Sequence, residues 1–482
     1  MFRVFVFSWQ IRVSIMNTVL KFGGTSVADA DAIDRVAAIV RRQLEADGSS
    51  APPIVVVSAL AKVTDALLDA ARRAEEGDAD SAVARVEALI ERHVAVASAL
   101  ASGASRANLT AAIVDEFSAV SGLVRALAVL REVSLRSLDA VVAAGELASS
   151  RIVAAAFLER GIPARWVDAR QIVVTDDEHT AALPALDATR DRARDMLGRA
   201  AAAGQVAVLG GFIGATSRGV TTTLGRGGSD YSAAIVGASV DAREIQIWTD
   251  VDGMLTADPR IVDAPRLVRE LSFAEASELA YFGAKVLHPS TILPAVARNI
   301  PVRILNARHP DVEGTLITAD ARRAGAVLAA IACKRDVTVV DITSTRMLMA
   351  HGFLRRLFEV FERFKTAVDV VTTSEVSVSV TVDDTRRLDE IIENLRTFAD
   401  VSCEPDMAIV CAVGENLRTD AALFGRAVGA LGRIPLRLVS QAASRRNVTF
   451  VLRNVDVPEA MNRLHEAFFS TRDANTASQA FA

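Results

Sequence analysis

The stretch TTTLGRGGSDYSAAIV, residues 221–236, places one arginine among three glycines and continues directly into an apolar segment. Glycine lets the main chain adopt positive φ and approach a ligand closely, because it has no Cβ. Ser229 and Asp230 are common helix-capping types, so we expect a helix to begin there. Helix N-termini attract anions, and Arg226 adds a planar fork that fits a carboxylate or a phosphate. The stretch predicts an anion-binding junction between a strand and a helix, although a glycine-rich turn with a solvated arginine has the same pattern.

The segments around this junction alternate between strands and helices. Short apolar runs at residues 19–22 and 54–58 read as buried strands, and further strands are predicted at 164–167, 206–210 and 244–249. Residues 31–44 have helical periodicity, and residues 65–143 are alanine-rich and helical. This order predicts an α/β fold in which helices sandwich a mainly parallel sheet. In such folds ligands bind at the carboxyl ends of strands.

After about residue 325 the pattern changes. Residues 337–398 form a β-α-β-β-α series, and residues 408–468 repeat it after an offset of roughly 70 residues. The repeat predicts two small ferredoxin-like modules. Neither module contains an obvious reactive group, so we expect them to bind a ligand or to pair with another chain.

Composition excludes several classes of protein. A chain of 482 residues predicts two to four domains, and a formal charge of −5 argues against nucleic-acid binding. Three irregularly spaced cysteines and six scattered histidines predict neither a disulfide framework nor a protein-built metal site, and they suit the cytoplasm. Arg12 interrupts the apolar N-terminus, so we expect no signal peptide, and Met1 and Met16 are both possible starts. No later apolar run is long enough to predict a membrane span.

Further polar groups follow other predicted strands. KFGGTS, from Lys21, combines a cation with glycines and hydroxyls, which suits a polyphosphate. It is neither a Walker A motif nor a dinucleotide fingerprint. TDVDG follows the strand at 244–249, and FGAKVLHP brings Lys285 to a predicted helix start. Each of these alone also fits an ordinary turn.

Taken together, KFGGTSVAD, GFIGA with TTTLGRGGSDYSA, IWTDVDGMLTADPR and FGAKVLHP resemble the motifs of aspartokinases, which are members of the amino-acid kinase superfamily. The paired C-terminal modules resemble ACT regulatory domains. The resemblance implies an amino-acid kinase domain at residues 17–322, followed by ACT modules of βαββαβ topology at 327–402 and 403–470, with strand exchange between them. It also implies ATP-dependent phosphorylation of the β-carboxylate of L-aspartate to β-aspartyl phosphate, the first step towards lysine, threonine and methionine.

This reaction agrees with the residues present. A carboxylate with a pKa of about 4 is already ionised at neutral pH, so the nucleophile needs no general base. The requirement is charge compensation as two anions approach in line. Mg²⁺ would be bound mainly through the phosphates of ATP, because it prefers to keep several waters.

The resemblance also implies roles for individual residues. The expected catalytic residues are Lys21, Asp230 and Lys285. The aspartate substrate is expected at Ser58, Thr64, Glu146, Arg226, Gly227 and Ser229. The nucleotide is expected at Lys21, Gly23, Gly24, Thr25, Thr249, Asp250, Leu255, Asp258, Arg260, Lys285 and Val286.

The segment VDVVTTSEVSVSV resembles the effector-binding segment of a first ACT module, which implies feedback inhibition by an amino acid. The expected effector-binding residues are Met347, Ala350, Gly352, Phe353, Leu354, Val368, Asp369, Ser374 and Glu375. Lysine is the leading effector, while threonine, or lysine together with S-adenosylmethionine, remains an alternative. By analogy the modules pair between subunits, which predicts a homodimer or a larger assembly.

Three positions depart from the pattern of the family. Leu255 stands where tyrosine is common, Lys62 stands where glycine is common, and Ala350 stands where some lysine-sensitive members have serine. Two other functions remain open: a different amino-acid kinase acting on acetylglutamate or glutamate, and a non-catalytic amino-acid sensor. The ACT pair and Glu146 count against the first, and retention of Lys21, Arg226, Asp230 and Lys285 counts against the second.

Overall fold

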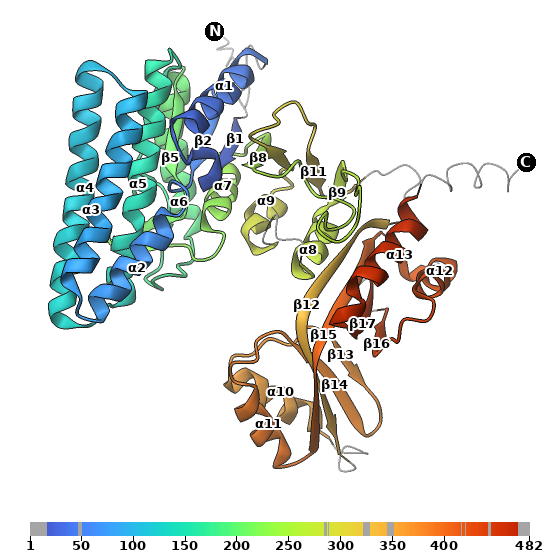
Figure 1. Cartoon of the computed structure of the whole chain (residues 1–482). Helices are drawn as coiled ribbons and strands as arrows, with labels where there is room; N and C mark the ends of the chain where they lie inside the picture. The colour runs from blue at the N-terminus through green and yellow to red at the C-terminus, as the bar shows by residue number, and fades with distance from the viewer. Residues whose placement is uncertain are drawn as a thin grey trace, which may run out of the picture. The chain divides into compact units, whose positions relative to one another are not determined.

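The computed structural model describes residues 17–46, 51–283, 287, 289–321, 328–344, 351–415, 417–419, 421–441 and 445–470. They form two compact units, drawn in Figure 1. The first contains the residues up to Asp252 together with Ser290–Ala319, and the second contains Gly253–Pro289 together with the residues from Asp320 onward. Gly253–Pro289, which lies inside the predicted kinase region, therefore belongs to the second unit.

The first unit is built on a sheet with the order β3-β5-β2-β1-β8-β10-β11. The pairs from β3 to β10 are parallel, and β10 pairs with β11 antiparallel. β1 (TVLKF) and β2 (IVVV) are buried along their whole length, as expected for parallel strands covered on both faces. The strands are β1 (Thr18–Phe22), β2 (Ile54–Val57), β3 (Ala164–Trp166), β5 (Val206–Gly210), β8 (Glu244–Thr249), β10 (Val302–Asn306) and β11 (Thr315–Thr318). A small second sheet has the order β4 (Val174–Thr175), β6 (Ile213–Thr216) and β7 (Thr221–Thr223).

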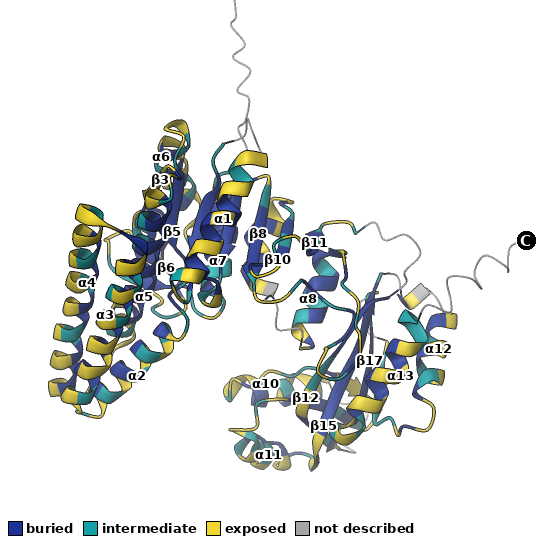
Figure 2. Cartoon of the chain, turned by 45° about the horizontal axis from the view of Figure 1, so that its top comes forward, coloured by how far each residue is buried: buried dark blue, intermediate teal, exposed yellow. Residues whose placement is uncertain are grey.

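Helices cover this sheet, and Figure 2 shows their exposed outer surfaces and the buried strands between them. α5 packs on β2, β3 and β5 and contacts α1, whereas α7 packs on β1 and β8 and contacts α6 and α9. The alanine-rich region expected to be helical forms α2, α3, α4 and the start of α5. The helices are α1 (Ala30–Ala46), α2 (Val63–Glu75), α3 (Ala79–Leu100), α4 (Gly103–Leu130), α5 (Leu135–Glu159), α6 (Leu186–Ala202), α7 (Gly228–Ser239) and α9 (Leu293–Ala297), with 3-10 turns η1 (Gly24–Val27), η2 (Ala169–Gln171) and η3 (Pro289–Ile292).

α5 is the central helix of the first unit. Among the described helices it alone is long and apolar enough to cross a bilayer, but 83% of that apolar stretch is buried inside the protein. Ile152, Val153 and Phe157 join the same hydrophobic cluster as Leu20 and Phe22 of β1. Its apolar character is therefore that of a core helix.

The second unit contains an antiparallel sheet with the order β13-β14-β12-β15-β17-β16. The long strands β12 and β15 take part in both modules: residues 328–334 of β12 pair with β15 beside β17, whereas residues 338–343 pair with both β14 and β15. The elements are β9 (Glu270–Ser272), α8 (Phe273–Tyr281), β12 (Leu328–Thr343), α10 (Phe353–Arg363), β13 (Val371–Thr373), β14 (Ser377–Val382), α11 (Leu388–Arg396), β15 (Asp400–Gly414), η5 (Leu417–Thr419), α12 (Ala421–Leu431), β16 (Leu438–Ser440), β17 (Asn447–Arg453), η6 (Asn454–Asp456) and α13 (Val457–Phe469).

One strand of the first module differs from expectation. A strand is predicted at residues 368–371, but β13 covers only Val371–Thr373. The Val370 amide donates to the side-chain hydroxyl of Thr381 at 2.9 Å instead of to a backbone carbonyl. Asp369 and Val370 both pair with Thr381, through hydrogen bonds of 3.0 Å from the Asp369 amide to the Thr381 carbonyl and from the Thr381 amide to the Val370 carbonyl, so the regular ladder begins only at Val371.

Candidate active site

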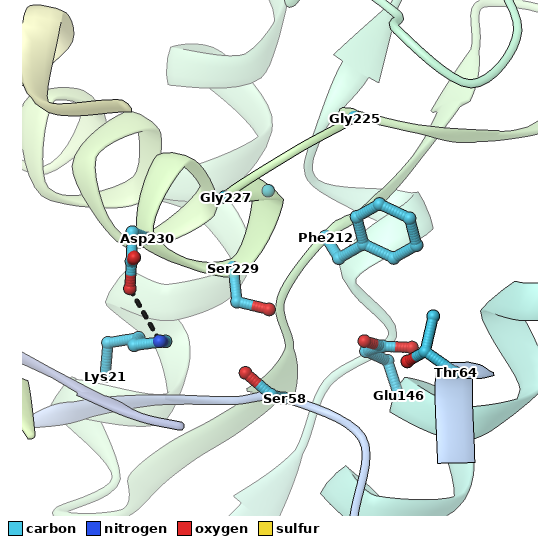
Figure 3. A pocket seen from close by; sticks show the side chains of 10 residues that line it. Lys21, Ser58, Thr64, Glu146, Phe212, Gly225, Gly227, Ser229 and Asp230 are labelled. Carbon is cyan, nitrogen blue, oxygen red and sulfur yellow. Dashed lines mark ion pairs between the residues drawn. The ribbon is translucent and has the colours of Figure 1, made fainter. Parts of the chain in front are cut away.

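A pocket of about 280 Å³ lies in the first unit, at the carboxyl ends of β1 and β2 and the N-terminus of α7 (Figure 3). This is the position that parallel α/β sheets favour for ligands. The pocket is lined by Lys21, Ser58, Thr64, Glu146, Phe212, Gly225, Gly227, Gly228, Ser229 and Asp230. Eight of these ten residues come from the motif stretches and helix α5, and separate parts of the chain thus converge on one cavity.

The cation of the pocket is Lys21 on the central strand β1. Its Nζ lies 2.6 Å from Oδ1 of Asp230, and both side chains are largely buried. Asp230 stands in the first turn of α7, where a negative charge also interacts favourably with the helix dipole. The pair fixes the ammonium group beside the N-terminus of α7, where an anion would be stabilised.

Helix α7 begins earlier than the sequence predicts. Its first residue is Gly228, and Gly227 is the N-cap in a left-handed conformation with φ of 70°. Ser229 and Asp230 therefore lie inside the first turn and do not cap the helix. The expectation that they begin it was wrong, because the left-handed Gly227 lets the chain turn into the helix before either residue. As a result both side chains are free to line the pocket.

Glu146 of α5 contributes a buried carboxyl group at the opposite side of the pocket, beside Thr64 (Figure 3). The residue is only 3% exposed, and its Oε2 has no hydrogen-bond partner in the described part of the chain. Burial raises the pKa of Glu146 to about 8, although the backbone amides of Ala59 and of Glu146 itself oppose the rise. The ionised form of a carboxyl group buried this deeply is unfavourable unless a cation joins it. The pocket is therefore prepared to receive a positively charged group here.

The loop before α7 only partly matches expectation. Gly225 and Gly227 line the pocket, but Arg226 between them is exposed and is not among the described residues that line it. Lys62, at the N-cap of α2 and two residues before Thr64, has φ of 65°. Glycine adopts that conformation without strain, so the lysine keeps a backbone geometry that would suit the glycine common in the family.

The expected nucleotide residues of the first unit lie at the same edge of the sheet as Lys21. Gly23 precedes η1, its amide donates to the Trp248 carbonyl at 3.2 Å, and Gly24 belongs to η1 with the exposed Thr25. Thr249 and Asp250 follow β8, the neighbour of β1. This edge presents glycines and hydroxyls next to the pocket.

The remaining nucleotide residues fall elsewhere. Leu255, Asp258 and Arg260 belong to the second unit, where the exposed Arg260 donates to Asp258 at 2.6 Å and lowers the pKa of that carboxyl group. Lys285 and Val286 lie outside the described residues. Among the described residues no cluster of three or more His, Cys, Asp or Glu is arranged to hold a metal ion.

The expected effector residues are in the second unit. Gly352 is the left-handed N-cap of α10, Phe353 packs edge-on against Phe398, and Leu354 is 40% exposed. Val368 packs against the hydrophobic core of this module. Met347 and Ala350 lie outside the described residues.

The polar effector residues are not adjacent within one chain. Asp369 precedes β13, whereas Ser374 and Glu375 follow it, so the strand separates them. The side chain of Asp369 is 2% exposed, and it accepts hydrogen bonds of 2.8 Å from both Lys334 and Tyr281. Ser374 bonds to Ser377, and Glu375 is exposed.

Sequence reasoning missed Phe212, Gly225 and Gly228 as pocket residues. A Cβ on Gly228 would lie 2.5 Å from the Phe212 ring, so the glycine is required for this packing. The GFIGA motif contains Phe212, but no local pattern indicates that its ring faces the pocket, because that depends on the contact with α7.

Comparisons with known proteins agree with this arrangement. Residues 16–306 match the amino acid kinase family, and residues 410–468 match an ACT domain. The chain is 37% identical to aspartokinase 3, chloroplastic, of Arabidopsis thaliana, over 96% of this chain and 84% of that protein. It also resembles the crystal structures of E. coli aspartokinase III in complex with aspartate and ADP (R-state; 34% identity) and with lysine and aspartate (T-state; 35% identity). Each match has a TM-score of 0.79 and covers 94% of this chain and 100% of the other. With the sheet, the pocket and the ACT-like unit as they stand, the chain belongs to the aspartokinase family.

Proposed function

We propose that this aspartokinase transfers the γ-phosphoryl group of ATP to the β-carboxylate of L-aspartate in the pocket that contains Lys21 and Glu146. The observation that carries the proposal is that one small cavity brings together a helix N-terminus, a lysine and a buried carboxyl group whose Oε2 has no hydrogen-bond partner among the described residues. An amino acid presents both an ammonium group and carboxylates, and is complementary to this set. E. coli aspartokinase III, which is similar over its whole length, has been solved with aspartate and ADP.

In this proposal Glu146 binds the α-ammonium group of aspartate, with Ser58 and Thr64 beside it. The amides at the start of α7, together with Ser229 and Arg226, bind the α-carboxylate. Arg226 reaches the ligand only if its exposed side chain folds towards the pocket, which its flanking glycines allow. The β-carboxylate would then face Lys21.

Lys21 neutralises charge on the transferring phosphoryl group, and Asp230 keeps its ammonium group in place. Gly23, Gly24 and Thr25 contact the phosphates, and Thr249 and Asp250 hold the nucleotide from the end of β8. The family resemblance also assigns Leu255, Asp258 and Arg260 of the second unit to the nucleotide, together with Lys285 and Val286, which lie outside the described residues. Mg²⁺ would be held mainly by the phosphates of ATP and would supply positive charge there. Aspartate attacks as the ionised carboxylate, so no side chain has to remove a proton.

A coupled assay of ADP release tests this function. The purified chain is supplied with ATP, Mg²⁺ and, in separate reactions, L-aspartate, L-glutamate or N-acetylglutamate. Turnover with aspartate and at most weak turnover with the other two is the expected result. Preference for glutamate or acetylglutamate would assign a different amino-acid kinase, and a lack of turnover with all three would favour the non-catalytic sensor.

We further propose that lysine regulates the enzyme through the first ACT module, and that two chains pair along β13. β13 is an edge strand whose three residues are all exposed, and an edge of this kind offers unpaired backbone groups to another strand. Antiparallel pairing about Thr372 would place Asp369 of each chain opposite Glu375 of the other. Such pairing reunites the effector residues that β13 separates within one chain. Lysine would then bind through acidic side chains from both chains.

The boundaries proposed for the kinase domain and for the two ACT modules are 17–322, 327–402 and 403–470.

We also propose that the enzyme works in the cytoplasm. The cysteines support this location, because Cys333, Cys403 and Cys411 are all free thiols.

A further inference from the structure

Asp139 is a fully buried carboxylate in the first unit that takes part in no role described so far. It lies on α5, two helical turns before Glu146, and its exposed fraction is 0%. Its Oδ2 accepts a hydrogen bond from His179 Nδ1 at 2.7 Å, and its Oδ1 accepts one from Thr223 Oγ1 at 2.5 Å. The Thr180 amide donates to both oxygens, at 3.1 and 3.2 Å. A charge buried this deeply is retained only where several donors compensate it.

The donors come from two segments that lead to the pocket. Thr223 ends β7, two residues before the pocket glycine Gly225. His179 and Thr180 belong to the loop at residues 176–183. The Ala182 amide of this loop donates to the Thr223 carbonyl at 2.9 Å, so the loop is bonded directly to the end of the strand. Asp139 therefore ties both segments to the helix that carries Glu146.

The hydrogen bonds to Asp139 hold Thr180 in a strained backbone conformation. Its φ is 70°, a left-handed conformation that β-branched residues rarely adopt. The carbonyl oxygen of Thr180 lies 3.1 Å from where a Cβ on Gly225 would stand. The loop at residues 176–183 thus packs directly against Gly225, the first glycine of the pocket. The hydrogen bonds to Asp139 hold Thr180 in its unfavourable conformation.

We infer that Asp139 is a positioning residue for amino-acid binding: through His179, Thr180 and Thr223 it fixes Gly225–Gly228 at a set distance from Glu146. Helix α5 then fixes the distance between the two ends of the amino-acid site, which are the buried carboxyl group of Glu146 and the glycine-rich N-terminus of α7. A neutral residue could fill the same space, but it would not hold three donors as strongly, because hydrogen bonds to a charged acceptor are about twice as strong as neutral ones.

The experiment measures KM for aspartate, KM for ATP and kcat of Asp139→Asn, with folding checked by circular dichroism and thermal melting. This test rests on the proposed function. Loss of charge on a buried acceptor should raise KM for aspartate about tenfold or more, while KM for ATP changes less than about twofold. Phe157→Leu is the matched control, since it disturbs the buried far end of the same helix and should lower the melting temperature without shifting either KM.

A double-mutant cycle of Asp139→Asn with His179→Asn gives a second readout. If the two residues act as a pair, the combined change in aspartate KM is clearly smaller than the product of the single changes. Independent effects, or an unchanged aspartate KM in folded Asp139→Asn, would overturn the inference. If Asp139→Asn fails to fold, Thr223→Val removes one donor and should raise KM for aspartate by a smaller factor, and no change would also overturn it. Absence of aspartate kinase activity in the unmodified chain would instead refute the proposed function.

Discussion

Lys334 of β12 donates a hydrogen bond to Asp369 at 2.8 Å. The carboxylate that is expected to bind the effector is therefore already paired with an ammonium group of the protein itself. Lys334 also lies 2.7 Å from Asp383 and 5.4 Å from the centre of the Tyr281 ring. Burial alone would lower the pKa of Lys334, but the hydrogen bonds to the two carboxylates outweigh it and raise the pKa. Tyr281 ends α8, the helix that precedes the FGAKVLHP motif.

Lys334→Met should increase sensitivity to lysine. The substitution keeps the aliphatic stem but leaves the Asp369 carboxylate without its internal cation, so an incoming ammonium group no longer has to displace one. We expect the lysine concentration for half-inhibition to fall about tenfold, from titrations at fixed aspartate and ATP. A half-inhibition value that is unchanged or higher would show that the internal ion pair does not compete with the effector.

Lys21→Met should reduce kcat by about 100-fold or more, because a group that stabilises charge in the transition state is lost. Asp230→Asn should cause a smaller loss, since Lys21 remains but is no longer held by the ion pair of 2.6 Å. Steady-state assays at saturating aspartate and ATP measure both. Nearly normal turnover of Lys21→Met would remove this residue from the phosphoryl-transfer site.

The activity at low aspartate should depend on pH through Glu146. Because burial raises the pKa of Glu146 to about 8, its carboxyl group is protonated in the free protein below that pH and cannot pair with an ammonium group. kcat/KM for aspartate, which reports on free enzyme, should therefore rise with pH and level off above about 8. The kcat profile should turn at lower pH, because bound ammonium favours the carboxylate.

Glu146→Gln provides the control for this assignment. It should abolish the rise in kcat/KM towards pH 8 and increase KM for aspartate, since an amide neither titrates nor carries charge. A rise that persists in Glu146→Gln would have to come from another group.

Arg226→Ala should raise KM for aspartate while KM for ATP stays nearly constant. Loss of a buried charge contact costs about 2 to 5 kcal/mol, and the exposure of Arg226 places it at the low end, about 2 kcal/mol or roughly 30-fold. Arg218→Ala is the matched control, because Arg218 is an exposed arginine between β6 and β7 that does not line the pocket. Equal effects of the two substitutions would indicate a general electrostatic effect.

Val371→Lys should separate paired chains. A lysine on an edge strand disfavours pairing with another strand, and Val371 of β13 is 42% exposed. Val439→Lys, on the opposite edge strand β16 with 39% exposure, is the control and should keep the assembly intact. Size-exclusion chromatography with light scattering gives the masses. A mass unaffected by Val371→Lys would place the interface elsewhere.

Much of the fold could be predicted from local patterns. The runs at 206–210 and 244–249 match β5 and β8 residue for residue: β5 is continuously apolar, as buried parallel strands are, and β8 has the β-favouring residues Ile245, Ile247 and Trp248 at its centre. β13 begins later than predicted because Asp369 and Val370 both pair with Thr381 of the facing strand, and α7 begins earlier because of a left-handed glycine. Both depend on neighbours that a linear pattern does not contain.

The sequence by itself determined the α/β order, the glycine-rich junctions and the identity of most of the polar groups at the site, because these depend on residue type and short spacing. Only the tertiary structure decided which of those groups meet. It left Oε2 of Glu146 without a hydrogen-bond partner among the described residues, paired Lys21 with Asp230, placed Lys334 against Asp369 and buried Asp139 among donors from two segments. Charge, burial and hydrogen bonding between residues distant in sequence arise only when the sheet and its helices bring them within a few ångströms.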